Sequence, residues 1–170
     1  MKTFLGTAVF LFVTAIAITP QARSQSKLVT ADIKNAEGRS VGAATLSNAS
    51  RGVKIKLDIK DLPPGQHSIH IHQVAKCDPP DFKSAGPHFG GAHAEHEHGA
   101  PAGDIPNFSL IVAADGTAHV SVVAPNVSMG SGGNSVFSNG GTSIVIHAAT
   151  DPSAAGAPAR IACGIITKPE

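Results

Sequence analysis

The sequence lacks any long stretch of helical periodicity, and this absence decides its predicted fold class. Its 18 Gly and 12 Pro divide the chain into short segments rich in Val, Ile and Thr. Short segments of this composition, bounded by turn residues, are typical of β-strands. The sequence therefore predicts an all-β protein.

A large charge of either sign is also missing. Basic and acidic residues number 13 and 12, which gives a formal charge of +1. Proteins that bind nucleic acids or anionic membranes through electrostatics carry a marked basic excess. We therefore expect neither a nucleic acid nor a membrane as a partner.

Long apolar runs are confined to the N-terminus. Lys2 precedes an apolar to weakly polar run over residues 4–18, and small residues surround a candidate cleavage point between Ala22 and Ser24. This pattern is typical of a secretory signal peptide, and the run is shorter than the roughly 20 residues that cross a bilayer. We interpret residues 1–24 as a signal peptide, cleaved after Ser24 or Ala22. Residues 25–170 are then one exported domain, which we place in the periplasm.

Cysteine is scarce, and its two occurrences are Cys77 and Cys163. In an exported chain an even pair of cysteines is usually a disulfide. Such a bridge would close a loop of roughly 85 residues and stabilise the fold by about 4–5 kcal/mol. Two buried thiols are the alternative.

Eight segments have the composition of strands, and eight strands are enough for a closed sandwich or barrel. Residues 53–59 alternate apolar and charged side chains, so that one face packs inward and the other meets water. Two irregular segments, 76–107 and 151–159, are long enough to be functional loops. A third, 125–142, is expected to plug one end of the barrel. The predicted strands are 28–35, 40–46, 52–59, 68–73, 108–113, 118–123, 143–148 and 160–166.

Histidines form the main chemical pattern of the chain. His70 and His72 stand two residues apart in an apolar segment, so the period of a strand places both imidazoles on one face. A single strand histidine is usually a satisfied surface or core side chain, but a convergent pair favours a metal site, and imidazole suits copper and zinc. His67 is out of phase with His70, and we interpret it as making a structural hydrogen bond behind the site. Further candidate ligands follow along the chain: His88, His93, His96, His98, Asp104 and His147.

With these residues the chain resembles the copper,zinc superoxide dismutases in their bacterial periplasmic form. Each matching segment is weak alone, but their order and content together are specific. The resemblance implies an eight-stranded Greek-key β-sandwich or barrel with two long functional loops that hold the metals outside it. The matching segments are PGQHSIHIH at 64–72, Cys77, SAGPHF at 84–89, AGDIPN at 102–107, IVIH at 144–147 and ARIACG at 159–164.

The resemblance also implies roles for single residues. Arg160 would dock the anionic substrate beside copper, with a solvated surface charge as the alternative. Asp151 would orient one copper and one zinc ligand through hydrogen bonds, with a loop N-cap as the alternative. His88 would bridge the two metals through its two ring nitrogens. The implied copper ligands are His70, His72, His88 and His147.

The zinc part departs from the family pattern. A histidine usually stands three residues before the aspartate, and this sequence has Pro101 there, which cannot bind zinc. Structural zinc sites have four ligands. The loop over residues 151–159 also contains no Lys or Glu, so we expect a weaker dependence of the rate on ionic strength than in relatives with charged loops. The predicted zinc ligands are His88, His98, Asp104 and His96, with His93 as the alternative to His96.

The resulting hypothesis is a superoxide dismutase that uses copper as cofactor, with zinc structural or absent. Superoxide, the small-molecule partner, would be converted to dioxygen and hydrogen peroxide, with Arg160 holding the anion and His88 carrying a proton. The rival is a non-catalytic periplasmic copper- or zinc-binding protein that uses the histidine tract over residues 93–98. Four copper ligands and Arg160 are more than metal sequestration needs. A homodimer is left open.

Overall fold

The chain forms an antiparallel β-structure with very little helix. The computed structural model describes residues 28–91, 101–148 and 158–169. None of the helices in these ranges is long and apolar enough to cross a membrane. The strands are β1 (Val29–Asn35), β2 (Ser40–Asn48), β3 (Val53–Ile59), β4 (Gly65–His67), β5 (Ile69–His72), β6 (Leu110–Val112), β7 (Ala118–Ala124), β8 (Thr142–His147) and β9 (Arg160–Ile166), with short 3-10 helices η1 (Lys83–Ala85) and η3 (Ser138–Gly140).

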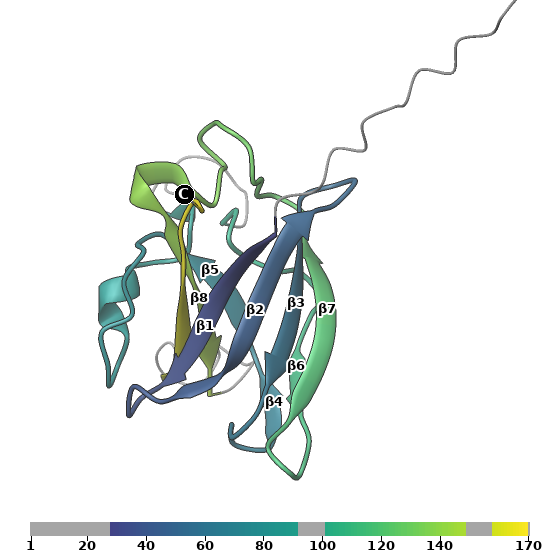
Figure 1. Cartoon of the computed structure of the whole chain (residues 1–170), viewed down its shortest axis with the longest axis vertical. Coiled ribbons are helices and arrows are strands. Elements are labelled where there is room, and N and C mark those ends of the chain that lie inside the picture. Colours follow the sequence, from purple (N-terminus) through teal and green to yellow (C-terminus); the bar gives the residue numbers. More distant parts are fainter. Residues whose placement is uncertain (1–27, 92–100, 149–157, 170) are drawn as a thin grey trace, which may run out of the picture.

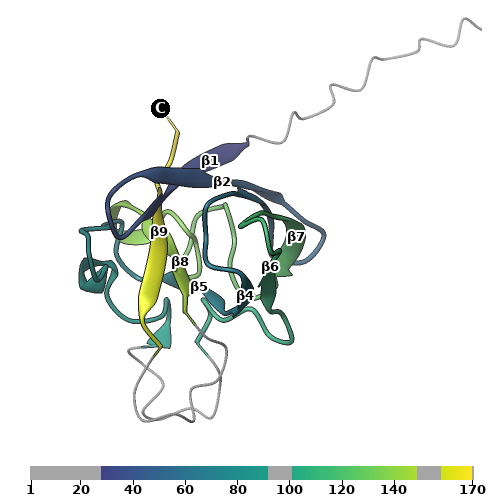
Figure 2. The ribbon, with the colours of Figure 1, turned by 90° about the horizontal axis from the view of Figure 1, so that it is seen from below.

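Seven strands make one curled sheet, which forms a half-barrel (Figures 1 and 2). The strand order is β5-β8-β9-β1-β2-β3-β7, and β4 and β6 form a separate two-stranded sheet. β3 pairs with β7 and β5 pairs with β8, so the chain crosses over between strands that are not consecutive. The all-β sandwich or barrel predicted from the sequence is confirmed.

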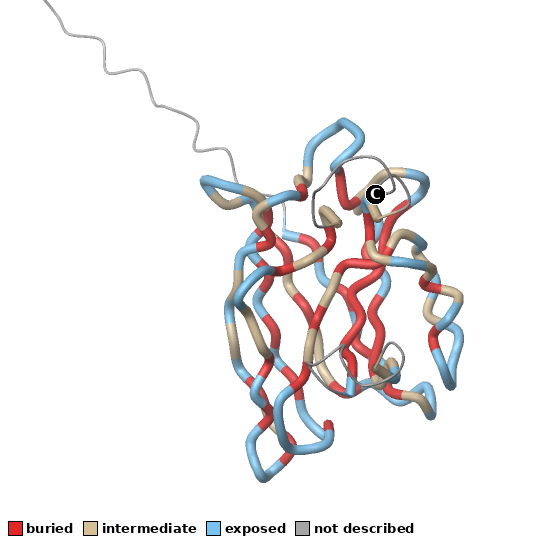
Figure 3. Tube along the Cα trace, turned by 180° about the vertical axis from the view of Figure 1, so that it is seen from behind, coloured by how far each residue is buried: buried red, intermediate tan, exposed pale blue. Residues whose placement is uncertain are grey.

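Strict alternation of side chains builds the core. In β3, Val53, Ile55, Leu57 and Ile59 are buried while the charged residues between them are exposed. The same two-residue period runs along β1, and buried and exposed segments alternate along the trace in Figure 3. Burying one such aliphatic side chain contributes about 1.5–3 kcal/mol relative to leaving it exposed. This hydrophobic face fixes which side of each strand looks inward.

Where the sequence predicts one strand, over residues 68–73, the structure contains two, β4 and β5. The chain pairs with β6 through β4, passes Ser68, and then pairs with β8 through β5. Gly65 has a φ of 129° at the start of β4, a conformation that favours glycine. No strand was predicted over residues 65–67, but the backbone there pairs with β6. As a result β5 lies directly beside β8, the strand that ends at His147.

Cys77 and Cys163 form a disulfide with a Cα–Cα distance of 5.6 Å, which confirms the predicted bridge. Around it lies a small second core in which Phe82, Ala85 and Val145 are fully buried. The disulfide and this core fasten the segment after β5 to the strands β8 and β9.

The irregular segment over residues 125–142 packs into the main core. Val127 and Val136 are buried there, and Met129 and Phe137 pack against the same cluster. This is the packing expected of a segment that closes one end of the barrel.

Candidate metal centre

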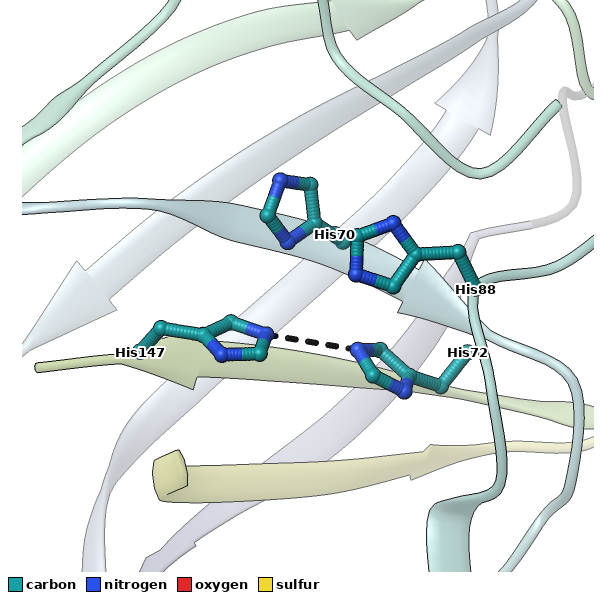
Figure 4. A group of neighbouring side chains, drawn as sticks. All are labelled: His70, His72, His88 and His147. Carbon is teal, nitrogen blue, oxygen red and sulfur yellow. Dashed lines mark hydrogen bonds between the residues drawn. The ribbon is translucent and has the colours of Figure 1, made fainter. Parts of the chain in front are cut away.

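Four histidines from three parts of the chain meet at one point (Figure 4). His70 and His72 lie on β5, and His147 is the last residue of β8. His88 lies in the loop after η1, where its backbone bridges to His72. One ring nitrogen from each of the four lies within 4.8 Å of the others. The structure thus brings together the four residues that the sequence predicts as copper ligands.

The loop that carries His88 and Asp104 is held against β5 by backbone hydrogen bonds. The Ile71 N–H donates to the Gly103 carbonyl at 2.9 Å, and the Phe89 N–H donates to the Ile71 carbonyl at 2.9 Å. A Cβ atom on Gly103 would collide with the carbonyl oxygen of Ile71, so only glycine fits this close approach. Asp104 is thereby placed opposite His70.

Backbone carbonyls fix the tautomers of two histidines. His72 donates from Nδ1 to the Gly86 carbonyl at 2.9 Å, and His147 donates from Nδ1 to the Pro158 carbonyl at 3.1 Å. Since a carbonyl only accepts, both Nδ1 atoms carry the proton and both Nε2 atoms keep a lone pair in the neutral ring. These Nε2 atoms are 3.3 Å apart (Figure 4). Two lone pairs at this distance repel one another unless a proton or a metal ion lies between them.

The other two rings also offer free nitrogens. The Nδ1 atom of His70 is buried and has no hydrogen-bond partner among the described residues. Leaving such a group unsatisfied costs roughly 1–3 kcal/mol, which a metal ion would offset. His88 donates from Nδ1 to Asp104 Oδ1 at 2.7 Å, which leaves its Nε2 with a lone pair. The donor set therefore fits a metal ion that prefers imidazole ligands.

Burial keeps the rings neutral. Desolvation, followed by the nearby His88 and His147, lowers the pKa of His70 from 6.5 to about 3. Desolvation likewise lowers the pKa of His72 to about 3, against the opposing effect of its hydrogen bond to Gly86. The pKa of His147 is lowered too, mainly by burial. Metal binding requires neutral imidazole, so these rings are ready to bind without first losing a proton.

Arg160 is the first residue of β9 and pairs with His147 across a bulge. Its guanidinium donates to the carbonyl of Phe82 at 2.8 Å and to the carbonyl of Gly86 at 2.9 Å. Burial lowers its pKa from the usual range of arginine, but the guanidinium stays cationic at neutral pH. A fixed positive charge therefore stands beside the four histidines, as an anion-binding role requires.

Comparison with known proteins identifies the family. Residues 40–166 match the family described as copper/zinc superoxide dismutase (SODC). The chain belongs to the copper/zinc superoxide dismutase family. This family is one of oxidoreductases, so the predicted enzyme class and the resemblance seen in the sequence are both confirmed.

Bacterial members of the family are similar to this chain in sequence and in structure. The chain is 42% identical over 146 residues to Cu-Zn superoxide dismutase 1 of Aquifex aeolicus, covering 80% of this chain and 85% of that protein. It is 42% identical over 149 residues to the Cu-Zn superoxide dismutase of Caulobacter vibrioides, covering 81% and 84%. A double-mutant form of a SOD-like protein from Bacillus subtilis has a similar structure, with a TM-score of 0.72, 32% identity and coverage of 82% and 97%.

Gly86 is a site residue that the sequence reasoning did not single out. Its carbonyl oxygen accepts hydrogen bonds from both His72 and Arg160, and its φ of 75° favours glycine. The glycine in the matched segment 84–89 was the available signal, but a glycine pattern does not reveal that its carbonyl is the functional atom. Carbonyl contacts of this kind depend on tertiary structure alone.

His67 has the structural role predicted for it. The ring is buried, with Nδ1 2.9 Å from the His147 carbonyl and Nε2 2.8 Å from the Pro63 carbonyl. It therefore ties the corner before β5 to the end of β8, behind the metal centre of this superoxide dismutase family member.

Part of the predicted site lies outside the described residues. These positions are His93, His96, His98 and Asp151. Of the predicted zinc ligands, the described ranges contain His88 and Asp104, which face each other at 2.7 Å.

Proposed function

We propose that this chain is a superoxide dismutase, which converts superoxide to dioxygen and hydrogen peroxide at a histidine-bound copper. The observation that carries the proposal is the convergence of four imidazole nitrogens within 4.8 Å of one another, beside an arginine whose guanidinium is held by two backbone carbonyls. When bound, copper supplies a one-electron redox centre with two accessible oxidation states. The ligands would be His70, His72, His88 and His147.

Arg160 would bind the substrate anion. Its guanidinium is held by two carbonyl oxygens and lowers the pKa of both His72 and His147 through its charge, so it lies close to both rings. A preoriented cation attracts and positions an anion without reorganisation at the moment of reaction. His88 would handle the proton, because its second ring nitrogen can hold a proton that is later delivered to the reduced anion.

We further propose a zinc ion that binds where His88 now donates to Asp104. Histidine nitrogen and carboxylate oxygen are both zinc ligands, and four ligands complete a structural site. His98 and His96, which lie outside the described residues, would supply the other two. Metal analysis of the copper-loaded protein tests this proposal, and a sample with full activity and no zinc would contradict it.

The experiment for the main proposal is cyanide-sensitive removal of superoxide by copper-loaded protein. We expect His147→Ala to abolish activity through loss of copper, and Arg160→Ala to lower kcat/KM by about tenfold through loss of the docking charge. His119→Ala is the matched control, since His119 is an exposed histidine paired with Asp58 on the far strands of the sheet. No activity of the copper-loaded protein above that of the metal-free protein would refute the proposal in favour of simple metal storage. Unchanged activity in His147→Ala would refute the proposed copper site.

Export is proposed on the sequence pattern alone. Residues 1–24 would be removed as a signal peptide, leaving residues 25–170 as one domain in the periplasm. N-terminal sequencing of the protein from a periplasmic extract should give a chain that begins after Ser24 or Ala22. A cytosolic chain that begins at Met1 would contradict it.

A further inference from the structure

Side chains that peroxides oxidise readily are scarce in this chain. The sequence contains no Trp and no Tyr, and its two cysteines form the disulfide. Its two methionines are Met1, within the predicted signal peptide, and Met129. Met129 therefore carries the one sulfur atom of residues 25–170 that is not already oxidised, and a reduced sulfur atom is the group that peroxides attack.

Met129 lies at an open pocket that the proposed chemistry does not use. The pocket has a volume of about 430 Å³, and Met129 lines it together with Phe137 and Lys168 near the C-terminus (Figure 1). Met129 is partly exposed, so a molecule as small as hydrogen peroxide reaches its side chain from solvent. The rest of the described lining consists of small residues: Gly130, Ser131, Gly132, Ser135 and Ser138.

The same side chain also fastens the glycine-rich turn over residues 128–135 to the barrel. Met129 packs against the main hydrophobic core, and every other residue of the turn is serine, glycine or asparagine. A Cβ atom at Gly130 or Gly133 would meet nothing within 4 Å, so the turn has open space around it. The apolar packing of this turn on the core therefore depends on Met129.

We propose that Met129 is a site of oxidation by hydrogen peroxide, and that its sulfoxide loosens the turn over residues 128–135 from the barrel. A lone pair of the thioether sulfur attacks one oxygen of the peroxide, an S–O bond forms, and the O–O bond breaks. The sulfur loses two electrons, and the second oxygen leaves as water with both protons of the peroxide. This inference rests on the proposed function only for the source of the peroxide, because any hydrogen peroxide drives the same reaction.

Oxidation changes the packing because a sulfoxide is polar. Its oxygen accepts hydrogen bonds, and burying such an acceptor against apolar side chains is unfavourable. The sulfoxide should therefore turn toward the pocket and water, and the turn should lose its apolar contact with the core. Backbone hydrogen bonds within the turn, such as that from the Ser128 N–H to the Asn134 carbonyl at 2.9 Å, do not involve the sulfur. We therefore expect a local opening and a less stable protein.

The experiment treats the metal-free protein with hydrogen peroxide in the presence of a chelator, so that oxidation is limited to direct reaction with the peroxide. Peptide masses, the midpoint of thermal unfolding and hydrogen exchange of the turn are measured. Met129→Leu is the matched control, because leucine has a similar volume and no sulfur. Met129→Gln places a polar side chain at the same position without any oxidation.

We expect Met129 to gain one oxygen atom at a rate within roughly tenfold of that of free methionine, since the side chain is partly exposed. The midpoint of thermal unfolding should then fall by about 5 °C, and amide exchange in the turn should become faster. Met129→Leu should show neither change, and Met129→Gln should have the lower midpoint before peroxide is added. A methionine sulfoxide reductase should restore both the mass and the midpoint.

Full oxidation of Met129 with an unchanged midpoint and unchanged exchange would overturn the inference. Oxygen gained chiefly at other residues of the metal-free protein would also overturn it. The assay of superoxide removal tests the proposed function separately. Oxidation of Met129 that opens the turn, in a protein without superoxide activity, would support the inference and refute the proposed function alone.

Discussion

At the scale of the residue, burial and carbonyl partners make these histidines suited to bind a metal ion. Desolvation favours the neutral imidazole, and the carbonyls of Gly86 and Pro158 hold the proton of two rings on Nδ1. Each ring is therefore left with a lone pair on Nε2. The same neutrality has a consequence for the stability of the metal-free protein.

The metal-free protein should lose stability as the pH falls below about 6.5. The unfolded chain then takes up protons on histidines whose folded pKa is about 3, namely His70 and His72. Between the folded and the unfolded pKa, each such group lowers the free energy of unfolding by up to about 1.4 kcal/mol for every pH unit of acidification. The loss is smaller when the group is partly exposed. Above pH 6.5 these rings are neutral in both the folded and the unfolded chain, so they should add no pH dependence to the free energy of unfolding.

Urea unfolding at pH 7, 6, 5 and 4 in the presence of a chelator measures this slope. His70→Gln should flatten it, whereas His119→Gln, an exposed site, should leave it as in the unchanged protein. Equal slopes in the two variants would contradict the assignment to the buried rings.

Strand spacing and the family resemblance predicted which histidines meet, but neither predicted through which atoms. The spacing of His70 and His72 placed both rings on one face, and the family resemblance added His88 and His147. The orphaned Nδ1 of His70 and the partners of Nδ1 in His72 have no signature in the sequence, because a backbone carbonyl is present at every position. The roles of these residues as copper ligands stay a prediction until metal is measured.

At the scale of the element, the loop after β5 depends on its backbone contact with that strand. Gly103 lies against the carbonyl of Ile71, and its own carbonyl accepts the Ile71 N–H. Through this contact, Asp104 is held opposite His70. The absence of a side chain at Gly103 therefore allows the loop to lie this close to β5.

Gly103→Ala should push the loop away from β5 and lower copper affinity by at least tenfold, with a loss of about 1–3 kcal/mol of stability. Gly130→Ala is the matched control, because a Cβ there meets nothing within 4 Å. Copper affinity by competition with a chelator and thermal unfolding give the two readouts. An affinity for Gly103→Ala that matches Gly130→Ala would show that the close approach is unimportant for the site.

The disulfide between Cys77 and Cys163 lies beside Phe82, whose carbonyl holds Arg160. Replacing Cys77 and Cys163 by Ser should cost about 2–5 kcal/mol of unfolding free energy. It should also weaken the binding of inorganic phosphate, an anion that probes the proposed anion site at Arg160. Phe82, whose carbonyl holds Arg160, lies in the small core beside the bridge. Chemical denaturation and calorimetry measure the two effects. Full phosphate affinity in the double Ser variant would show that the core alone positions Arg160.

Strand positions followed from the sequence, since every predicted strand end lies within two residues of an observed one. The division of this region into β4 and β5 at Ser68 did not follow from the sequence. Strand composition reports that a segment is extended, but the partner with which it pairs depends on residues far along the chain, here β6 and β8. For this reason the strand predicted over residues 68–73 did not include β4.

At the scale of the whole molecule, the metal centre joins parts of the chain that are far apart in sequence. His70 on β5 and His147 on β8 are ligand candidates on adjacent strands, and the loop with His88 lies over both. A metal ion bound here would bind only the folded state. Ligands of the folded state raise its stability in proportion to the logarithm of their free concentration.

Copper should therefore raise the melting temperature. At a free concentration of about 1,000 times Kd the gain is about 4 kcal/mol, or roughly ten degrees for a domain of this size. Differential scanning calorimetry with and without copper measures the shift, and His147→Ala should remove most of it. A shift of equal size in that variant would place the copper elsewhere.

The shared carbonyl of Gly86 links a histidine of the metal centre to the arginine proposed to bind the anion. One oxygen atom holds a histidine of the metal centre and the arginine of the anion site, so a displacement of this peptide disturbs both together. Among variants of this loop, the affinity for copper and the affinity for an anion should therefore rise and fall together. Tuning one without the other requires changes at other residues.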